Sequence, residues 1–462
     1  MFIELGRAKK FFGEKIFNQL LKYLRQDPLS NLDRIFELVE KAPLMSHHRE
    51  YLEQIRSQFE TSPAMREYIS NLLTNSHRNV QEGLLVNFFV NAGIIGAPRQ
   101  YQLAEELGHA VPFTILIDPT SNCNLNCKGC WAGKYEKYNS LSLKEVDRII
   151  QEAKELGIYF IVLSGGEPLL WPHLIELCER HQDVAFMAYT NGTLIDKERA
   201  REMKRVGNIS PAISLEGGRK ATDERRGQGV FNEIMKGMDN LKEEGVFFGC
   251  SLTVTRENCE EVFSDQFIDL IINKGAMYGW SFHYIPVGSN PDYSMMLTPE
   301  QRSKLVDRVD EIRSKRSFPL ADFWNDGSLT VGCIAGGRRY FHINASGDLE
   351  PCAFVHFTID NIKGKSLKEL LDNPLLHSYQ KRQPFSENVL RPCPLIDVPE
   401  ALKEVVAEAG AEPSHQEADN IFQPEEAEKL AQIAADWKEE ADLLQEKGTK
   451  CDREKEREMV AT

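Results

Sequence analysis

Several classes of protein are excluded by what the sequence lacks. It has 55 Lys and Arg against 70 Asp and Glu, a formal net charge of −15, and therefore no basic excess for binding nucleic acid. Its most apolar stretch, residues 83–97, is too short and too interrupted by Asn for a membrane span, which needs about 20 apolar residues. No internal repeat is evident. The 462 residues, 42% of them hydrophobic, are enough for two or three globular domains with ordinary cores.

A secretory segment is also missing, although the sequence contains ten Cys. We therefore expect a reducing compartment, the cytoplasm, and no disulfide framework. Four Cys have no paired spacing, and we interpret Cys178 and Cys250 among them as buried small apolar side chains. The other six fall into two sets whose positions indicate metal chemistry.

The first set comprises Cys123, Cys127 and Cys130, directly after the apolar run of residues 113–117. Three thiolates on one loop can hold three corners of a cubane iron–sulfur cluster and leave the fourth iron open. A structural zinc ion would need a fourth ligand close by, but no Cys or His occurs between Cys130 and His173. Zinc is therefore the weaker interpretation.

This Cys-x3-Cys-x2-Cys spacing, with Trp131 beside the last Cys, resembles the signature of the radical S-adenosylmethionine (SAM) enzymes. The resemblance implies a 4Fe-4S cluster whose open iron binds SAM. It also implies reductive cleavage of SAM to a 5′-deoxyadenosyl radical, which abstracts hydrogen from an unactivated C–H bond. An electron donor such as flavodoxin or ferredoxin is implied as a partner.

Motifs further along the chain support the resemblance. Residues 164–168, Ser-Gly-Gly-Glu-Pro, follow an apolar run and match the family's SAM-binding Gly-Gly-Glu-Pro, although a plain strand-to-helix turn is the alternative. Polar residues follow the next two apolar runs, at the edge where parallel strands bind ligands. An Asp-x-x-Arg-Gly-like stretch comes next and could place an Arg near the SAM carboxylate, although a solvated charged turn is the alternative for this stretch. The expected cofactor-binding residues are Trp131, Gly165, Gly166, Glu167, Pro168, Asn191, Ser214, Glu216, Arg225 and Arg226.

Six apolar runs alternate with helical patterns between residues 111 and 288, which predicts an α/β fold. Six such units fit the incomplete (β/α)6 barrel of radical SAM cores. We expect a helical N-terminal region over residues 1–110, the barrel over 111–290, an iron–sulfur extension over 291–400 and an acidic helical tail over 401–462. In the tail, Leu430, Ile433, Trp437, Ala441 and Leu444 recur at helix spacing and should pack on the body.

The second set comprises Cys333, Cys352 and Cys393. Its surroundings resemble the SPASM-type extension that carries auxiliary iron–sulfur clusters, although full SPASM domains have more Cys. We expect one auxiliary 4Fe-4S cluster. His356 could be its fourth ligand, but a hydrogen-bonded structural role is favoured, and a structural zinc site is the alternative for the whole set.

Residues 1–25 predict a basic amphipathic helix with Phe12, Ile16, Leu20 and Leu24 on one face. Such a helix either docks on its own domain, which we favour, or lies on an anionic membrane surface. The apolar stretch Leu84 to Ile95 predicts a buried helix or the wall of an apolar substrate channel. These two features favour a lipid-derived substrate and contact with the membrane periphery.

A peptide maturase is the second interpretation, although the N-terminal region lacks the strand pattern of a leader-peptide domain. A non-enzymatic electron carrier or iron sensor is a third, but it would not need a SAM-shaped pocket. Several segments, among them Arg391-Pro-Cys-Pro394, also resemble an uncharacterised clostridial-type group of radical SAM proteins.

Overall fold

The computed structural model of the chain describes residues 14–40, 56–57 and 59–460. Its centre is an open nine-stranded sheet in the order β7-β6-β5-β4-β3-β2-β1-β8-β9. All neighbouring pairs are parallel except β8 and β9. The strands are β1 (Thr114–Ile117), β2 (Phe160–Leu163), β3 (Ala185–Thr190), β4 (Ile209–Leu215), β5 (Gly249–Val254), β6 (Gly279–His283), β7 (Leu320–Asp322), β8 (His342–Ile343) and β9 (Leu349–Glu350).

Strands β1 to β6 coincide with the six apolar runs of the sequence, which confirms the predicted α/β barrel core. Parallel strands that are covered on both faces favour continuous β-branched and aromatic runs, and β2 (Phe-Ile-Val-Leu) is one of them. The sheet extends beyond the six predicted strands, because β7 pairs with β6 and β8 pairs with β1. The β8–β9 hairpin thereby joins the C-terminal extension to the first strand of the barrel.

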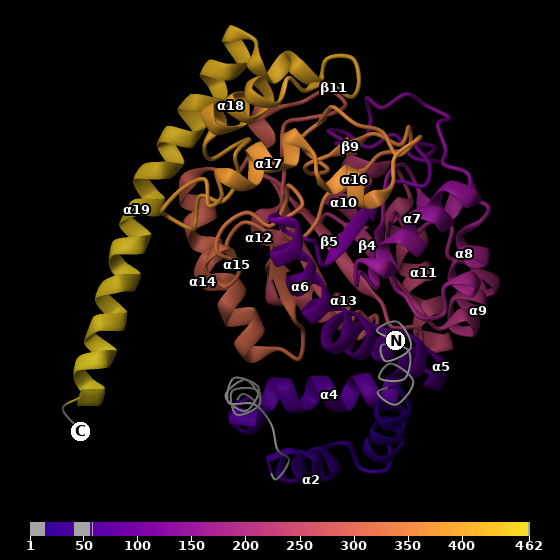
Figure 1. Cartoon of the computed structure of the whole chain (residues 1–462). Coiled ribbons are helices and arrows are strands. Elements are labelled where there is room, and N and C mark those ends of the chain that lie inside the picture. Colours follow the sequence, from indigo (N-terminus) through magenta and orange to yellow (C-terminus); the bar gives the residue numbers. More distant parts are fainter. Residues whose placement is uncertain (1–13, 41–55, 58, 461–462) are drawn as a thin grey trace.

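Helices on the outer side of the sheet complete the βα units (Figure 1). Helix α7 begins with the predicted capping box, in which Ser142 accepts from the backbone N–H of Glu145 and the Glu145 side chain accepts from Ser142. The helices of this layer are α7 (Leu143–Glu155), η2 (Pro168–Leu170), α8 (Leu174–Arg180), α9 (Lys197–Val206), α10 (Arg219–Arg226), α11 (Val230–Glu244), α12 (Cys259–Val262), α13 (Asp265–Asn273), η3 (Tyr293–Met295) and α14 (Pro299–Lys315).

The N-terminal region is helical, as predicted, and lies below the sheet in Figure 1. It comprises α2 (Pro28–Glu40), α4 (Pro63–Asn75), α5 (Arg78–Val80), η1 (Gln81–Gly96) and α6 (Ala97–Leu107). Helix η1 has π-helical hydrogen bonding and packs on β2 and β3.

One continuous helix, Arg78–Leu107, is long and apolar enough to cross a membrane by length and composition, but 56% of its most apolar window is buried in the fold. The Asn residues that interrupt its apolar sequence explain why this helix is buried in the fold. Asn87 donates to the carbonyls of Gln182 and Val184, and Asn91 donates to that of Asp183. The predicted buried helix is therefore present.

The described part of the predicted amphipathic helix, residues 14–24, docks on the protein. Leu21 is buried, and Phe17 and Leu24 pack with it against Leu73 and neighbouring residues of η1. Ile16, however, is 59% exposed, so the apolar face is only partly used. Phe12 and the rest of residues 1–13 lie outside the described residues.

The C-terminal part contains the helices α15 (Gly327–Thr330), α16 (Leu367–Leu371), α17 (Pro374–Lys381), α18 (Pro399–Ala409), η4 (Ala418–Phe422) and α19 (Pro424–Val460), with the small hairpin β10 (Phe357–Thr358) and β11 (Glu412–Pro413). The start of α19 packs on the body as predicted, since Leu430, Trp437 and Ala441 are buried. The rest of α19 projects away from the body (Figure 1).

Candidate functional site: the cysteine loop and the barrel lumen

The C-terminal ends of the parallel strands surround a cavity of about 240 Å³, which we call the lumen. Parallel α/β folds bind their ligands at this end of the sheet. Most of the residues predicted from the sequence line it: Cys123, Cys127, Cys130, Trp131, Gly165, Gly166, Asn191, Ser214, Arg225 and Arg226. Glu167, Pro168 and Glu216 do not line it and lie behind it. Their expected roles in cofactor binding stay predictions.

The cysteine loop rests directly on the Gly-Gly-Glu-Pro turn. Gly166 donates its backbone N–H to the carbonyl of Thr120 at 3.0 Å, and Glu167 donates to that of Asn122 at 2.7 Å. A Cβ on Gly166 would stand 2.2 Å from the Asn122 carbonyl oxygen. Only glycine therefore allows the two segments to approach this closely.

Glu167 is fully buried, and its carboxylate connects two strand ends. It accepts from the Thr190 hydroxyl and the Asn191 backbone N–H, both at 2.7 Å, and from the Leu169 N–H at 3.0 Å. Burial raises the pKa of this carboxyl, while these donors act to lower it. Glu167 therefore fixes the geometry of the Thr190–Asn191 rim.

Two Arg side chains flank the cysteine loop, and both pair with Glu216. Arg225 reaches a Glu216 oxygen at 2.6 Å, and Arg226 holds both oxygens at 2.5 and 2.7 Å. Burial acts to raise the pKa of Glu216, but the two guanidinium groups lower it overall. The group of three ions keeps one excess positive charge beside Cys127, where it favours a bound anionic cluster or carboxylate.

The thiols of Cys123 and Cys127 are protonated at neutral pH, because their pKa values are raised. Burial raises the pKa of Cys123 to about 11, and it raises the pKa of Cys127 against the opposing effect of Arg226 and Arg225. A cluster must displace these protons, as it does at other cysteine metal sites. The free thiols, the glycine contact and the positive charge together fit a SAM-binding iron–sulfur cluster.

The deeper wall of the lumen is aromatic and apolar, with Phe160, Met187, Tyr189, Trp280 and Phe282 among its residues. His283, at the end of β6, also faces the lumen, is 3% exposed and has no hydrogen-bond partner on either ring nitrogen. Burial and the charge of Arg302 lower its pKa well below the usual value, so it is neutral. His283 could not be predicted as a site residue, because nothing in the sequence distinguishes a single His in a strand from a core residue.

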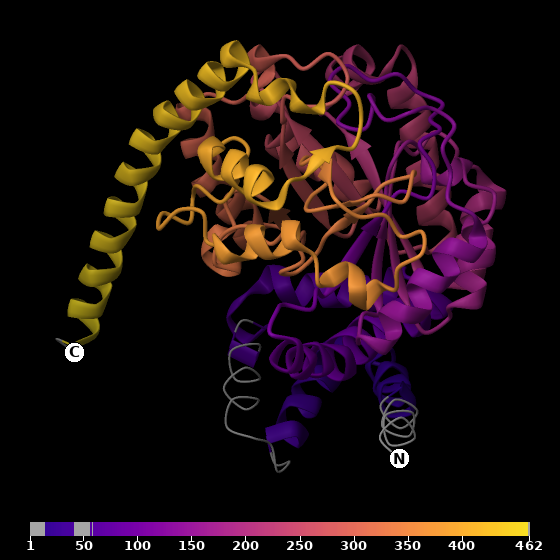
Figure 2. The same ribbon diagram turned by 45° about the horizontal axis from the view of Figure 1, so that its top comes forward.

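The second cysteine set borders the same lumen. The segments around Cys333 and Cys352 contribute Ile334, Ala353 and Phe354 to its wall, and Figure 2 shows the orange segment that follows β7 lying across this end of the sheet. The Tyr340 hydroxyl lies 3.0 Å from the Cys352 sulfur, and that of Tyr379 lies 3.4 Å from the Cys333 sulfur. The contacts of these two Tyr side chains with the Cys residues could not be predicted from the sequence either.

Cys352 is buried, and Cys333 and Cys393 are partly buried. This burial raises the pKa values of all three thiols, that of Cys352 to about 12. His356 has both ring nitrogens engaged, with the Ala353 carbonyl at 2.8 Å and with His415 at 2.8 Å. This favours the structural interpretation of His356 over a role as fourth ligand.

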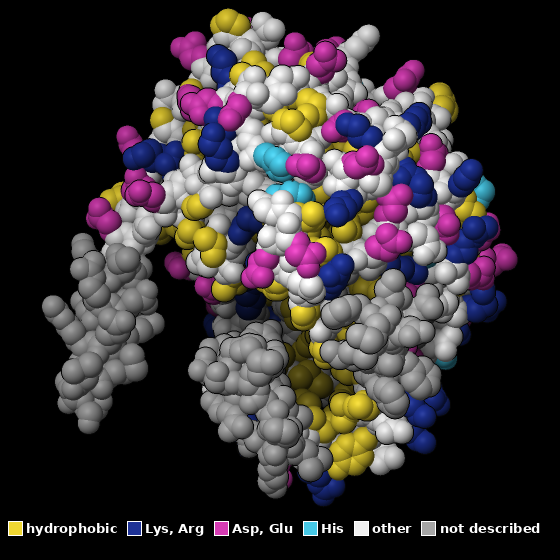
Figure 3. Space-filling view, viewed as in Figure 1, with side chains coloured by type: hydrophobic (Ala, Val, Ile, Leu, Met, Phe, Trp, Pro, Cys, Tyr) yellow, Lys and Arg dark blue, Asp and Glu magenta, His cyan; other side chains and the backbone are white. Residues whose placement is uncertain are grey.

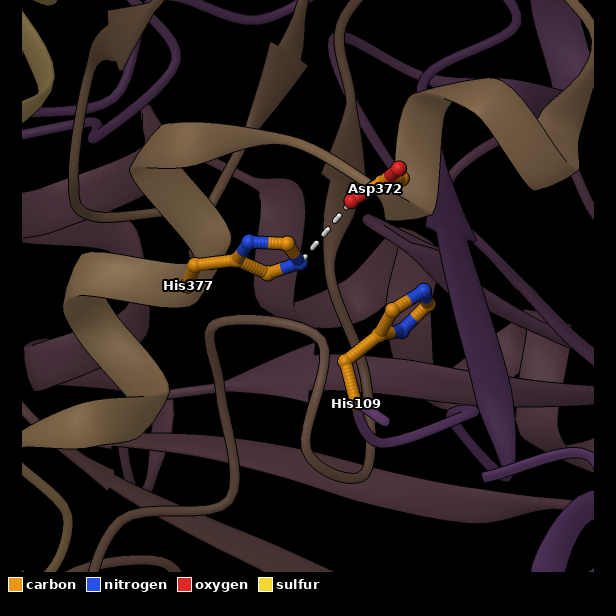
Figure 4. Close-up of side chains that lie close together, drawn as sticks. All are labelled: His109, Asp372 and His377. Carbon is orange, nitrogen blue, oxygen red and sulfur yellow. Dashed lines mark ion pairs between the residues drawn. The ribbon is translucent and has the colours of Figure 1, made fainter. Parts of the chain in front are cut away.

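Zinc is disfavoured by the spacing of the sulfur atoms. A zinc ion holds sulfur ligands at about 2.3 Å, which brings them within about 4 Å of one another. Among the residues that the structure describes, three candidate ligand atoms lie within 4.8 Å of one another only at His109, Asp372 and His377, which are drawn in Figure 4. Neither cysteine set is that compact.

Two family models match the chain. The Radical SAM superfamily model covers residues 117–262, and the SPASM model, an iron–sulfur cluster-binding domain, covers residues 333–394. The chain therefore contains a radical SAM domain followed by a SPASM domain.

Individual relatives agree with this. Fe-coproporphyrin III synthase of Methanosarcina barkeri is 30% identical over 44% of this chain and 53% of its own length, so the chain spans about half of that relative. AdoMet-dependent heme synthase of Oleidesulfovibrio alaskensis is 28% identical over 61% of this chain and 78% of its own length. The fold is similar to that of Streptococcus suis SuiB, solved with its precursor peptide SuiA, at a TM-score of 0.53 and 18% identity over 64% of this chain and 74% of that chain.

Proposed function

We propose that this radical SAM enzyme abstracts hydrogen from an unactivated C–H bond of a lipid-derived substrate, using a SAM-binding 4Fe-4S cluster on Cys123, Cys127 and Cys130. When bound, the cluster supplies the electron that cleaves SAM to methionine and a 5′-deoxyadenosyl radical. The observation that carries the proposal is that the three thiols and a set of apolar side chains line one cavity, the lumen.

The protein's own residues place the reactants and exclude water. Asn191 and Ser214 stand on the rim as partners for the polar part of SAM, and Arg225 and Arg226 favour its carboxylate. Trp131 packs edge-on against Phe354 and covers the loop on the side of the second cysteine set. The set Cys333, Cys352 and Cys393 would hold an auxiliary cluster a short way from the lumen.

The wall of the lumen supports an apolar reacting group. Phe160, Val162, Met187 and Phe282 offer neither donors nor acceptors, so an apolar group can pack on this part of the wall, while Ser214, Ser251 and Thr253 supply hydroxyls elsewhere in the lumen. We also propose a cytoplasmic location for the protein. The docking of Phe17, Leu21 and Leu24 on the protein uses part of the apolar face that membrane contact would need.

A peptide substrate is the second candidate, because SuiB was solved with a precursor peptide on a similar fold. In this chain the polar cavity of about 590 Å³ beside the lumen, lined by Lys134, His356, His415, Glu417 and other residues, is the place where a peptide would find polar partners. Its position next to Phe354, which lines both cavities, keeps this candidate open.

The test is anaerobic reconstitution with iron and sulfide, followed by SAM and dithionite and measurement of 5′-deoxyadenosine. We expect the wild-type protein to form it and Cys127→Ala to form none, since one of only three protein ligands is lost. Cys259→Ala, at a Cys outside both sets, is the matched control and should retain the yield. Normal yield from Cys127→Ala, or none from the wild type, would contradict the proposal.

A further inference from the structure

A second and larger cavity, of about 920 Å³, lies at the opposite end of the barrel. We call it the floor cavity, because the N-terminal ends of β2, β3, β4 and β6 contribute to its wall, through Phe160, Phe186, Ser210 and Tyr278 among others. Helices α4, η1 and α14 form the remaining sides. Figure 3 shows a hollow lined by hydrophobic side chains near the bottom of the view, in the region where Figure 1 draws α4.

The floor cavity is large enough for an organic ligand, since such sites usually measure about 300–1,000 Å³. Its wall is mainly apolar and includes Leu72, Leu84, Leu85, Phe88 and Phe89. Phe89 remains 49% exposed, and Leu329 on the other side is 76% exposed. Large apolar side chains that are this exposed and line a cavity often mark the binding site of a ligand or a partner.

Most polar side chains of this wall have partners inside the protein, whereas the structure shows no hydrogen bond from the side chains of Tyr68 and Trp280 to other described residues. The Ser210 hydroxyl lies 2.8 Å from that of Tyr278, and Arg313 donates to the Leu320 carbonyl and to Asp326. Arg316 pairs with Asp265 and Asp269. The floor cavity therefore offers few free groups for a peptide or sugar, and it suits a ligand that makes no hydrogen bonds.

Three side chains, Phe160, Met187 and Trp280, line both the floor cavity and the lumen. Met187 is 5% exposed, whereas Phe160 and Trp280 are only partly buried although they lie inside the barrel. A wall one side chain thick thus separates the two cavities. Met187 is the flexible member of this wall, because an unbranched thioether side chain changes rotamer easily.

We propose that the floor cavity binds the long hydrocarbon chain of the substrate, which enters from the N-terminal end of the barrel and reaches the lumen past Phe160, Met187 and Trp280. This deepens the proposed function by assigning a binding site and an entry side to the apolar substrate. SAM and the cluster then occupy the C-terminal end of the barrel, and the C–H bond to be attacked reaches them from the N-terminal end.

The test uses the reconstituted holoenzyme without SAM or dithionite and titrates it with cis-parinaric acid, a long-chain fatty acid whose fluorescence rises in apolar sites. Phe89→Glu places a carboxylate in the floor cavity and should weaken binding about tenfold or more, because the charge would be desolvated by the bound chain. Ile94→Glu is the matched control: it is on the same helix, 67% exposed and outside the cavity wall, and it should bind like the wild type.

Leu329→Glu is a second lining variant, from the other side of the cavity, and should also weaken binding. Octanoate, which has a short chain, should displace parinarate less well than stearate does. No parinarate binding by the wild type, or equal binding by Phe89→Glu, Leu329→Glu and Ile94→Glu, would overturn the inference. Formation of 5′-deoxyadenosine from SAM and dithionite, measured in parallel, reports on the proposed function separately and should persist in all three variants.

Discussion

His342 lies between the carboxylates of Asp118 and Glu350, with all three side chains almost completely buried. Its ring nitrogens are 2.9 and 2.7 Å from the two acids, and the Tyr135 hydroxyl donates to Glu350. Burial alone would lower the pKa of His342, but the two carboxylates raise it to about 10. This network joins β1 of the barrel to β8 and β9 of the extension, next to Trp131.

The raised pKa predicts a specific pH dependence of stability. A group with a higher pKa in the folded state than its ordinary 6.5 stabilises the fold fully below that pH, and this contribution is lost as the pH rises towards about 10. Urea unfolding of the wild type should therefore give a falling free energy between pH 6.5 and 10. His342→Gln should be less stable at pH 6.5 by about 3–5 kcal/mol, the usual cost of breaking a buried ion pair. Parallel curves for the two proteins across this range would refute the assignment.

At the residue scale, the sequence predicted side chains that belong to a spaced motif. Cys123, Cys127 and Cys130 could be predicted because their spacing on one loop already has a chemical meaning. His283 and the Cys352 partner Tyr340 could not, because only the folded sheet turns them towards the lumen or the sulfur. The role of Glu167 in SAM binding stays a prediction, while its carboxylate accepts hydrogen bonds from Thr190, Asn191 and Leu169.

At the scale of elements, the contact between the cysteine loop and the Gly-Gly-Glu-Pro turn depends on a missing side chain. Gly166→Ala would place a Cβ against the backbone of Asn122, which cannot move without moving Cys123. We expect a loss of stability of about 1–3 kcal/mol, as for overpacking elsewhere, and a loss of iron from the first site alone. Gly93→Ala is the control, since its Cβ would come no closer than 3.6 Å to the Phe88 carbonyl oxygen.

Thermal unfolding and iron analysis of both variants would check this prediction. A Gly166→Ala protein with the iron content and melting temperature of the wild type would show that the loop does not depend on the close approach. A loss of iron in Gly93→Ala as well would point to a general effect of the substitutions.

The long elements were predictable, and the short ones were not. Strands β1 to β6 are runs of four to seven residues whose apolar character marks them in the sequence. Strands β7 and β8 have three and two residues, too few for a period to be seen, and they form because β6 and β1 offer open edges. The Asn residues of η1 argued against a membrane span, and their bonds to the carbonyls of residues 182–184 give the reason.

At the scale of the whole molecule, the barrel is accessible from two ends. The SPASM segment borders the lumen at the C-terminal end, while the helical N-terminal region shapes the floor cavity at the other. This arrangement could not be predicted from the sequence, because the cavity is formed by elements far apart in the chain. The four-part division at residues 110, 290 and 400 and the likeness to a clostridial-type group stay predictions.

We propose that the two separate cysteine sets hold two clusters and that only the first binds SAM. The decisive measurement is electron paramagnetic resonance of the dithionite-reduced protein, with and without SAM, paired with iron and zinc analysis. We predict a signal that SAM perturbs in the wild type and in the triple variant C333A/C352A/C393A, which should contain less iron. In Cys127→Ala the perturbation should be absent. A SAM-perturbed signal in Cys127→Ala, or zinc in place of iron at the second set, would contradict the account.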